Sequence, residues 1–320
     1  MGYNTRECIL DCLNSIYNIE SDVSYEVIVV DNDSSDQSEE VIVKQYTKVQ
    51  WINMGYNSGF SRANNAGLKK AEGEFVMLLN PDTVVKAGFF RQLVDFYENN
   101  DAELKLGLVG CRIKTIDGKE LLVGSRRGFP GIGKQLLANP LFYKLNNTFK
   151  LIKPVDYIPS EMHEKNHEVD YLSGACLIIN RSKITDNNLF MDEDFFLYSE
   201  DVDWSYRVQK AGFHNYFCAE SEVYHINSGS TSSMKEGKFL QIMLSRLLLI
   251  YKCYGSMYFL SYCGLVKLNQ FTFKVFKLFG LKVIPNRDHD LMNKVISEKF
   301  GIVWRKYVLS SKETEYLKYD

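Results

Sequence analysis

A β-branched apolar run passes directly into a cluster of acids, amides and hydroxyls in the segment Glu26-Val27-Ile28-Val29-Val30-Asp31-Asn32-Asp33-Ser34-Ser35, and this segment is the clearest indication of the fold class. Such a run is typical of a strand buried on both faces, and the cluster is typical of the loop at its carboxyl end. The pattern returns at Phe75–Leu79, which is followed by Asn80-Pro81-Asp82. We therefore expect two strands of one sheet that both end in acidic and amide side chains.

Helical patterns separate these expected strands. Apolar residues recur on one helical face after Thr5, further helical patterns cover 38–46 and 59–71, and a short strand pattern covers 49–53. Strand–helix–strand units with short connections predict an α/β fold with a mostly parallel sheet and helices on both faces. In such sheets ligands bind beyond the carboxyl ends of the strands, which is where the acidic clusters lie.

The second half of the chain is less regular. The alternation of strand and helix patterns weakens over 115–168, which we interpret as a variable excursion over the sheet. A strand pattern returns at 169–180. A helix is expected from Glu200, a strand near Tyr216, and helices rich in aromatic residues after residue 234. These changes predict an α/β domain over 1–234, divided at 114 and 168, and a helical region over 235–320.

Composition excludes several classes of protein. A net charge of -2 argues against a general nucleic-acid binder, which would carry a basic stripe. The seven cysteines include no CxxC pair, which favours free thiols in a reducing compartment. The polar start of the chain has no apolar signal region, so we expect a cytoplasmic protein. The longest apolar stretch, 239–266, is interrupted by Arg246 and Lys252.

Six motifs occur in an order that is specific even though each is weak alone. They are Tyr3-Asn4-Thr5-Arg6, Val29-Val30-Asp31-Asn32-Asp33-Ser34, Gly59-Phe60-Ser61-Arg62-Ala63-Asn64-Asn65, Leu79-Asn80-Pro81-Asp82-Thr83, Gly174-Ala175 and Tyr198-Ser199-Glu200-Asp201-Val202-Asp203, followed by His225. Together they resemble family 2 glycosyltransferases of the GT-A fold, and in particular the rhamnosyltransferase-like branch of bacterial polysaccharide synthesis. The resemblance extends from residue 1 to about residue 235.

This resemblance implies an inverting enzyme that moves a sugar, such as rhamnose, from a UDP- or dTDP-sugar to a hydroxyl of a glycan or polyprenyl-linked acceptor. Residues 1–114 would then be the nucleotide-sugar-binding half and 169–234 the acceptor and base half. A catalytically impaired nucleotide-sugar-binding relative, or an assembly subunit, is the alternative. A Rossmann dehydrogenase is disfavoured, because no GxGxxG opens the first helix.

A divalent cation, Mg²⁺ or Mn²⁺, is expected to neutralise the donor diphosphate. Asp82 follows a strand and offers the oxygen ligand that such hard cations prefer. By resemblance it is the counterpart of the family's DxD motif, whose first position here is Asn80, and His225 takes the place of the family's late metal-binding histidine. A turn chosen for its geometry and a structural histidine are the alternatives.

Several residues are expected to contact the donor. Asp31 and Asp33 would face the nucleoside, because a carboxylate can accept the imide N–H of uracil or thymine. Arg62 could reach the diphosphate or the ribose, and a surface arginine is the alternative. The motifs add further donor-side candidates, namely Tyr3, Asn4, Gly59, Asn64 and Asn80.

Asp201 is the expected general base and Glu200 the expected acceptor-binding acid. Acceptor attack on the anomeric carbon needs a carboxylate that takes the hydroxyl proton, and both acids begin a helix whose dipole favours the ionised form. Asp203 should face elsewhere. The acceptor side is completed by Gly174, Ala175 and Trp204.

Two features concern the ends of this sequence. Members of the family usually have an apolar strand before the Tyr-Asn loop, and that first strand is missing here, so two neighbouring strands should be left with unpaired backbone groups. The C-terminal segment mixes aromatic residues with spaced Lys and Arg. Helices that pack on a protein surface are one interpretation of that segment, and a peripheral contact with an anionic membrane is the other.

Overall fold

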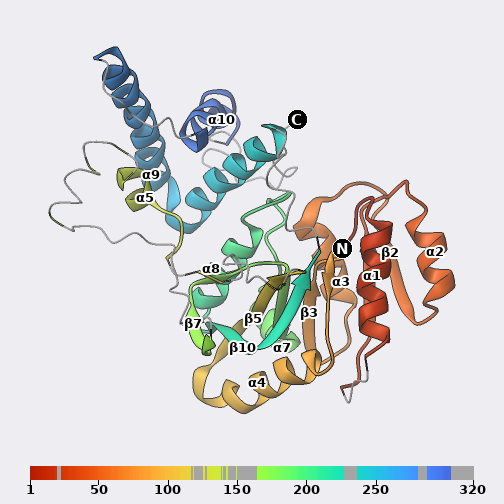
Figure 1. The fold of residues 1–320 in the computed structure, drawn as a ribbon. Coiled ribbons are helices and arrows are strands. Elements are labelled where there is room, and N and C mark those ends of the chain that lie inside the picture. Colours follow the sequence, from red (N-terminus) through yellow and green to blue (C-terminus); the bar gives the residue numbers. More distant parts are fainter. Residues whose placement is uncertain are drawn as a thin grey trace. The chain divides into compact units, whose positions relative to one another are not determined.

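A computed structural model describes residues 1–19, 23–116, 164–226, 236–279 and 287–303, together with short pieces of 118–149. The chain forms two compact units (Figure 1). The α/β unit comprises Met1–Arg127, Ile158–Phe196 and Glu200–Ser232, and the helical unit comprises the remaining segments. Most of the excursion expected over 115–168 lies outside the described residues.

The first strands of the α/β unit form a small parallel sheet. β1 (Val27–Asp31) pairs in register with β2 (Val49–Asn53), and α2 (Ser38–Gln45) is the crossover between them. Val27 and Val29 of β1 share an apolar cluster with Ile9 and Leu13 of α1 (Arg6–Tyr17). Both strands and the intervening helix therefore lie where the sequence pattern predicts them.

The main sheet has the strand order β3-β9-β5-β10-β4, with β7 beside β10. The bounds are β3 (Phe75–Leu79), β4 (Thr83–Val84), β5 (Leu106–Thr115), β7 (His167–Val169), β9 (Cys176–Asn180) and β10 (His214–His225). Among the described strands of this sheet only β5 and β10 pair in parallel, so the α/β class is confirmed but the sheet is mixed instead of mostly parallel. β9 is antiparallel to both of its neighbours, β3 and β5. The chain returns from the excursion through β8 (Tyr171–Leu172), and β9 can then enter from the opposite end.

Helices cover both faces of this sheet, as the sequence predicts. On one face α1 and α4 (Phe89–Leu104) bury Cys12 and Leu93 against β5 and β9. On the other face α3 (Gly59–Lys70), α7 (Arg181–Asn187) and α8 (Glu200–Lys210) bury Leu68 and Ile184. Alternate residues of β9 enter the two cores, which is the period of two that a strand with both faces buried requires.

The helical unit consists of α9 (Glu236–Leu278), α10 (Arg287–Val303) and α5 (Ile132–Leu137). Gly255, with φ 81° and ψ 178°, breaks α9 into two helices. The core of the unit is apolar and includes Leu247, Phe259 and Val295. A helical C-terminal region is therefore confirmed, and none of the described helices combines the length and the apolar character that a membrane span needs.

Candidate functional site

The loop after β1 is held together by its own side chains. Asp31 is 2% exposed and accepts hydrogen bonds from the backbone N–H of Ser34 at 2.8 Å and from the Ser34 hydroxyl at 2.5 Å. Asn4 joins the loop, because its N–H donates to Ser34 Oγ at 2.8 Å and its Oδ1 accepts from the Ser35 N–H at 2.9 Å. The two segments expected to bind a nucleoside therefore form one surface, on which Asp33 is exposed.

Asn32 connects this loop to the start of α3, a role that sequence reasoning missed. Its Nδ2 donates to Gly59 O at 3.0 Å, and its Oδ1 accepts from the Ser58 hydroxyl at 2.7 Å. Gly59 has φ 81°, and a Cβ there would lie 2.4 Å from Phe196 O. The lack of a side chain at Gly59 thus allows the backbone carbonyl of Phe196 to lie close to the start of α3. The signal in the sequence that could have indicated this role is an amide side chain directly after a strand that is predicted to be buried.

Two residues of α3 that were expected to contact the donor already have partners within the protein. The Arg62 Nε lies 3.8 Å from Glu193 Oε2, so the guanidinium already faces a protein carboxylate. Asn64 is 8% exposed, and its Nδ2 donates to Phe60 O at 2.9 Å. Asn64 therefore does not fit the expected donor contact, because its helical position turns it inward. Tyr3 is 46% exposed and open to a ligand.

The turn after β3 brings Asp82 to His225. The Asn80 N–H donates to Ala175 O at 2.9 Å, and the Thr83 hydroxyl donates to Asn80 O at 2.6 Å, which fixes the turn. β4 then pairs with β10 so that Thr83 lies opposite His225. As a result Asp82 Oδ1 lies 3.2 Å from His225 Nε2, although 143 positions separate the two residues in the sequence.

The donor atoms of this pair fit a hard divalent cation. The Nδ1 of His225 is buried and has no hydrogen-bond partner in the described part of the chain. Among those same residues no three His, Cys, Asp or Glu side chains gather as a metal cluster. Two protein ligands suit Mg²⁺ or Mn²⁺, because these ions commonly complete their shell with phosphate oxygens and water.

Asp201 and Glu200 begin α8 in different environments. Asp201 is partly exposed, and its oxygens accept the N–H groups of Gly174 at 3.0 Å and Val202 at 2.9 Å. Burial raises the pKa of Asp201, and these two N–H groups act against the rise. Glu200 is 6% exposed, and burial raises its pKa well above the usual value, with the charge of Asp201 as the next cause. Asp201 is therefore the more accessible carboxylate.

The segment Gly174–Ala175 holds both halves of the site. The Gly174 N–H binds Asp201, while the carbonyl of Ala175 accepts from the Asn80 turn that leads to Asp82. A Cβ on Gly174 would contact Asp201 Cβ at 3.5 Å, so the backbone and the helix start lie close together. One short segment thus links the candidate metal turn to the candidate base.

Two side chains of α8 differ from what the sequence suggests. Trp204 is fully buried, and its indole N–H donates to Leu189 O at 2.6 Å, so the expected acceptor contact is wrong. The reason is that Trp204 and Val208, four residues apart, share the helix face that packs on the sheet. Asp203 does face elsewhere, but it is 2% exposed and pairs with Arg207 Nε at 2.7 Å.

Two named proteins are similar to this chain over part of its sequence. The rhamnosyltransferase of Mycobacterium tuberculosis that acts on N-acetylglucosaminyl-diphospho-decaprenol is 29% identical over 219 residues, covering 64% of this chain and 67% of that protein. The low-salt glycan biosynthesis hexosyltransferase Agl10 of Haloferax volcanii is 24% identical over 204 residues, covering 62% of this chain and 58% of that protein. The matched stretches therefore leave about a third or more of each relative unaccounted for.

Solved structures agree on the fold. The structure of S. aureus TarS 1–349 in complex with UDP has a TM-score of 0.51 at 16% identity, covering 95% of this chain and 72% of that one. The structure of GalNAc-T7 with UDP, GalNAc and Mn²⁺ has a TM-score of 0.53 at 16% identity, covering 95% and 56%. The sequence profile described as glycosyl transferase family 2 matches residues 2–187, more than half of the 320 residues. With that match on this fold, the chain belongs to glycosyl transferase family 2 and is a glycosyltransferase.

Proposed function

We propose that the chain transfers a sugar from a UDP- or dTDP-sugar to a hydroxyl of a glycan or lipid-linked acceptor, with inversion, in cell-surface polysaccharide synthesis. The observation that carries this proposal is the Gly174–Ala175 segment, which binds Asp201 on one side and the Asn80 turn on the other. The proposed base and the proposed diphosphate site would thereby lie next to each other. The division into a catalytic domain over 1–234 and a helical region over 235–320 remains part of the proposal.

Asp201 would take the acceptor proton. As the hydroxyl oxygen forms its bond to the anomeric carbon, the bond from that carbon to the nucleoside diphosphate breaks, and the proton passes to the Asp201 carboxylate. Attack from the face opposite the leaving group inverts the configuration at the anomeric carbon. Two backbone N–H groups already fix the direction of the Asp201 oxygens, which leaves lone pairs for the acceptor.

The donor would lie on the surface formed by the loops after β1 and β3. Asp31 retains acceptor capacity for the imide N–H of uracil or thymine after binding Ser34. Asp82 and His225 would hold the divalent cation, which when bound supplies positive charge to the diphosphate. Rhamnose as the transferred sugar is supported by the name of the mycobacterial relative, whose acceptor is a decaprenol diphosphate derivative.

A donor-turnover assay tests this proposal. The chain is incubated with UDP- and dTDP-sugars and Mn²⁺, and release of the nucleoside diphosphate is measured with and without lipid-linked acceptors. We expect release from at least one donor, faster with acceptor present. Tight nucleotide binding without any release would instead favour the catalytically impaired relative. If the chain showed no nucleotide binding and no release, both interpretations would be contradicted.

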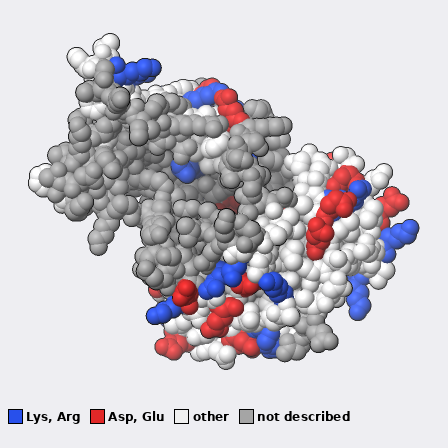
Figure 2. Space-filling model, viewed as in Figure 1, with Lys and Arg blue, Asp and Glu red and all other residues white. Residues whose placement is uncertain are grey.

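We also propose that the second half of α9 contacts an anionic membrane surface. Met257, Leu268, Phe271 and Leu278 are exposed by 48–82% and lie on one face of the helix, because their spacings of 11, 3 and 7 residues are close to whole turns. Basic side chains stand at the end of this helix (Figure 2). An exposed apolar stripe beside positive charge is the pattern of an interfacial helix.

Sedimentation with lipid vesicles measures this contact. We expect binding to vesicles that contain phosphatidylglycerol, and a loss of about tenfold or more in Phe271→Ser, because burial of a Phe side chain contributes about 1.5–3 kcal/mol. Val43→Ser, an exposed apolar residue of α2, is the matched control and should bind normally. Equal binding of the wild type and both variants would contradict a role for this face.

A further inference from the structure

The chain leaves the α/β unit for three residues just before the candidate base. Leu197–Ser199 belong to the helical unit, whereas Phe196 and Glu200, which flank them, belong to the α/β unit. Asp201 follows as the second residue of α8. Because the peptide chain is continuous, any contact that holds Leu197–Ser199 also bears on the start of α8. This segment is therefore a covalent route by which the helical unit can act on Asp201.

Two residues of the segment have an unusual backbone conformation. Tyr198 has φ 72° and Ser199 has φ 66°, so two consecutive residues with side chains lie in the left-handed region. Residues other than glycine rarely adopt this region, because the Cβ approaches the following carbonyl oxygen. Such a conformation persists only where surrounding contacts hold it, and it occurs mainly at functional sites. We call these two residues the left-handed pair.

The residue before the segment is fixed within the α/β unit. Phe196 is 8% exposed, and its carbonyl accepts the N–H of Phe60 at 2.7 Å. This bond anchors the chain at the start of α3. It lies one residue too early to hold the carbonyl of Leu197, which directly precedes the left-handed pair.

A serine of α9 holds the carbonyl of Leu197. The Ser245 hydroxyl donates to Leu197 O at 2.7 Å, and it accepts from Gln241 Nε2 at 3.1 Å. Ser245 and Gln241 are 2% and 5% exposed, so water has little access to either bond. The two side chains therefore form a short chain of hydrogen bonds that ends on the backbone next to the left-handed pair.

A second serine of α9 shows how unusual this arrangement is. The Ser261 hydroxyl donates to Met257 O at 2.9 Å, four residues earlier in the same helix. This is the bond that a serine inside a helix commonly makes. Ser245 instead donates to a carbonyl 48 positions away, while the residue four positions earlier orients its hydroxyl. Its hydrogen bond therefore serves the Leu197–Ser199 segment.

The segment leads directly to the two hydrogen bonds that orient Asp201. The carboxylate accepts the N–H groups of Gly174 at 3.0 Å and of Val202 at 2.9 Å. Both bonds depend on where α8 begins, because Asp201 and Val202 are its second and third residues. Relaxation of the left-handed pair to a common conformation would turn the first residues of α8 and move the carboxylate relative to Gly174.

We propose that Ser245, oriented by Gln241, is a positioning residue for the base. Its hydrogen bond to Leu197 O keeps the left-handed pair in place and thereby fixes the carboxylate of Asp201. Ser245 acts only through the backbone and touches no reacting atom. The inference rests on the proposed function, in which Asp201 is the base, and extends it by giving α9 a part in turnover.

Hydrogen exchange tests the structural step without any assay of activity. In Ser245→Ala we expect the amides of Gly174 and Val202 to exchange at least about tenfold faster than in wild type, because their acceptor is less well fixed. Ser261→Ala, on the same helix, is the matched control and should change neither amide. Unchanged exchange of both amides in Ser245→Ala would overturn the proposal.

Two further variants separate the hydrogen bond from packing. Ser245→Thr keeps the hydroxyl and should keep the exchange of wild type. Gln241→Met keeps the Ser245 hydroxyl but removes the group that orients it, so the same two amides should exchange faster, by a smaller factor than in Ser245→Ala. If Ser245→Ala does not fold, Gln241→Met decides in its place. Wild-type exchange in Gln241→Met would then contradict the proposal.

Turnover tests the functional step. Ser245→Ala should lower kcat by about tenfold, because a misplacement of about 1 Å can cost about 10²-fold. The donor KM should stay within about twofold, since the loss concerns the base. In the Asp201→Asn background the same substitution should cost less than about twofold, because the group that it positions is already inactive. A full loss in both backgrounds would mean that Ser245 acts on something other than the base.

These measurements let the inference and the proposed function fail separately. If Asp201→Asn turns over like wild type, the assignment of the base is wrong, while hydrogen exchange still decides whether Ser245 fixes the Asp201 carboxylate. If Asp201→Asn is impaired but Ser245→Ala turns over like wild type, the base assignment stands and the positioning role of Ser245 is refuted.

Discussion

Asp201→Asn is expected to lower turnover by about 10²- to 10⁴-fold, the usual contribution of a positioned general base. The amide keeps the size of the side chain but cannot take the acceptor proton. Stopped assays with saturating donor and acceptor give the rate. Donor affinity should stay within about twofold, because Asp31 and Asp82 lie on other strand ends. A turnover near that of wild type would contradict the assignment of the base.

The controls follow from the hydrogen bonds of Asp201. Asn can accept the N–H of only one of Gly174 and Val202, so a stability loss of about 1–3 kcal/mol is expected, and unfolding must be measured beside the rate. Asp186→Asn, an exposed acid on α7, is the matched control and should be silent. Asp203→Asn is a poor control, because it breaks the buried ion pair with Arg207.

Asp82→Ala is expected to weaken Mn²⁺-dependent binding of UDP by more than about 10- to 100-fold, the usual cost of losing even an outer partner of a metal site. His225→Ala should act in the same direction, because its ring nitrogen lies 3.2 Å from the Asp82 carboxylate. Calorimetric titration measures both. In wild type, EDTA should reduce affinity to the level of the variants.

Binding without added metal separates this effect from misfolding. The two variants and wild type should bind UDP equally weakly in EDTA, because the remaining contacts at Asp31 are unchanged. Asp95→Ala removes an exposed carboxylate of α4 that pairs with Arg91 and serves as the control. If EDTA left the affinity of wild type unchanged, the diphosphate would be neutralised by protein groups and the metal assignment would be wrong.

Much of the local structure could be predicted from the sequence. The strands over 49–53 and 75–79 match their expected bounds, and α1 begins at Arg6, directly after Thr5, although the Thr5 side chain makes no capping hydrogen bond. Short apolar runs flanked by polar loops contain this information locally. Strand pairing is not contained in such local patterns, and β9 is antiparallel to β3 and β5 although the sequence predicts a mostly parallel sheet.

For the candidate site, too, the sequence indicates individual residues but not the contacts between them. The motifs marked Asp201 and Gly174 separately, but the hydrogen bond between them depends on how β9 meets α8. Asn64 and Trp204 carry side chains that suit ligand binding, yet their helix faces turn them into the core. Asn32 was passed over because its bonds to Ser58 and Gly59 join segments that lie 26 and 27 positions away.

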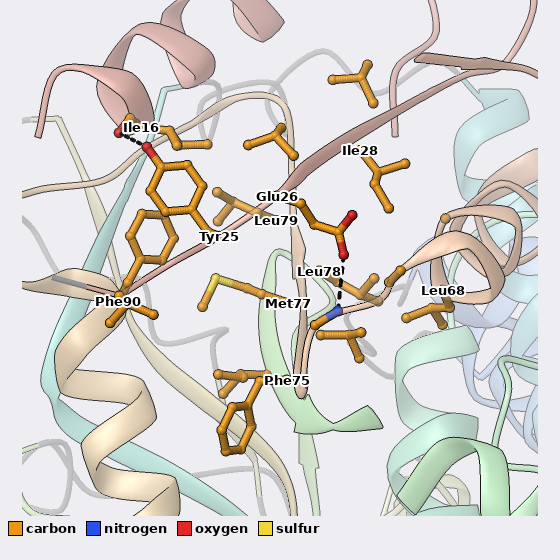
Figure 3. A pocket seen from close by; sticks show the side chains of 18 of the residues that line it. Ile16, Tyr25, Glu26, Ile28, Leu68, Phe75, Met77, Leu78, Leu79 and Phe90 are labelled. Carbon is orange, nitrogen blue, oxygen red and sulfur yellow. Dashed lines mark hydrogen bonds between the residues drawn. The ribbon is translucent and has the colours of Figure 1, made fainter. Parts of the chain in front are cut away.

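The α/β class, the strand ends that carry Asp31 and Asp82, and the acidic start of α8 could be predicted from the amino-acid sequence, because each depends on residues that are neighbours in the chain. The contact of Asp82 with His225, and the hydrogen bonds of the Gly174–Ala175 segment to both halves of the candidate site, became visible only in the folded structure. A cavity lined by residues of β1 and β3 likewise became visible only in the folded unit (Figure 3). The physical reason is that such contacts are set by strand order and helix facing, which depend on packing across the whole unit.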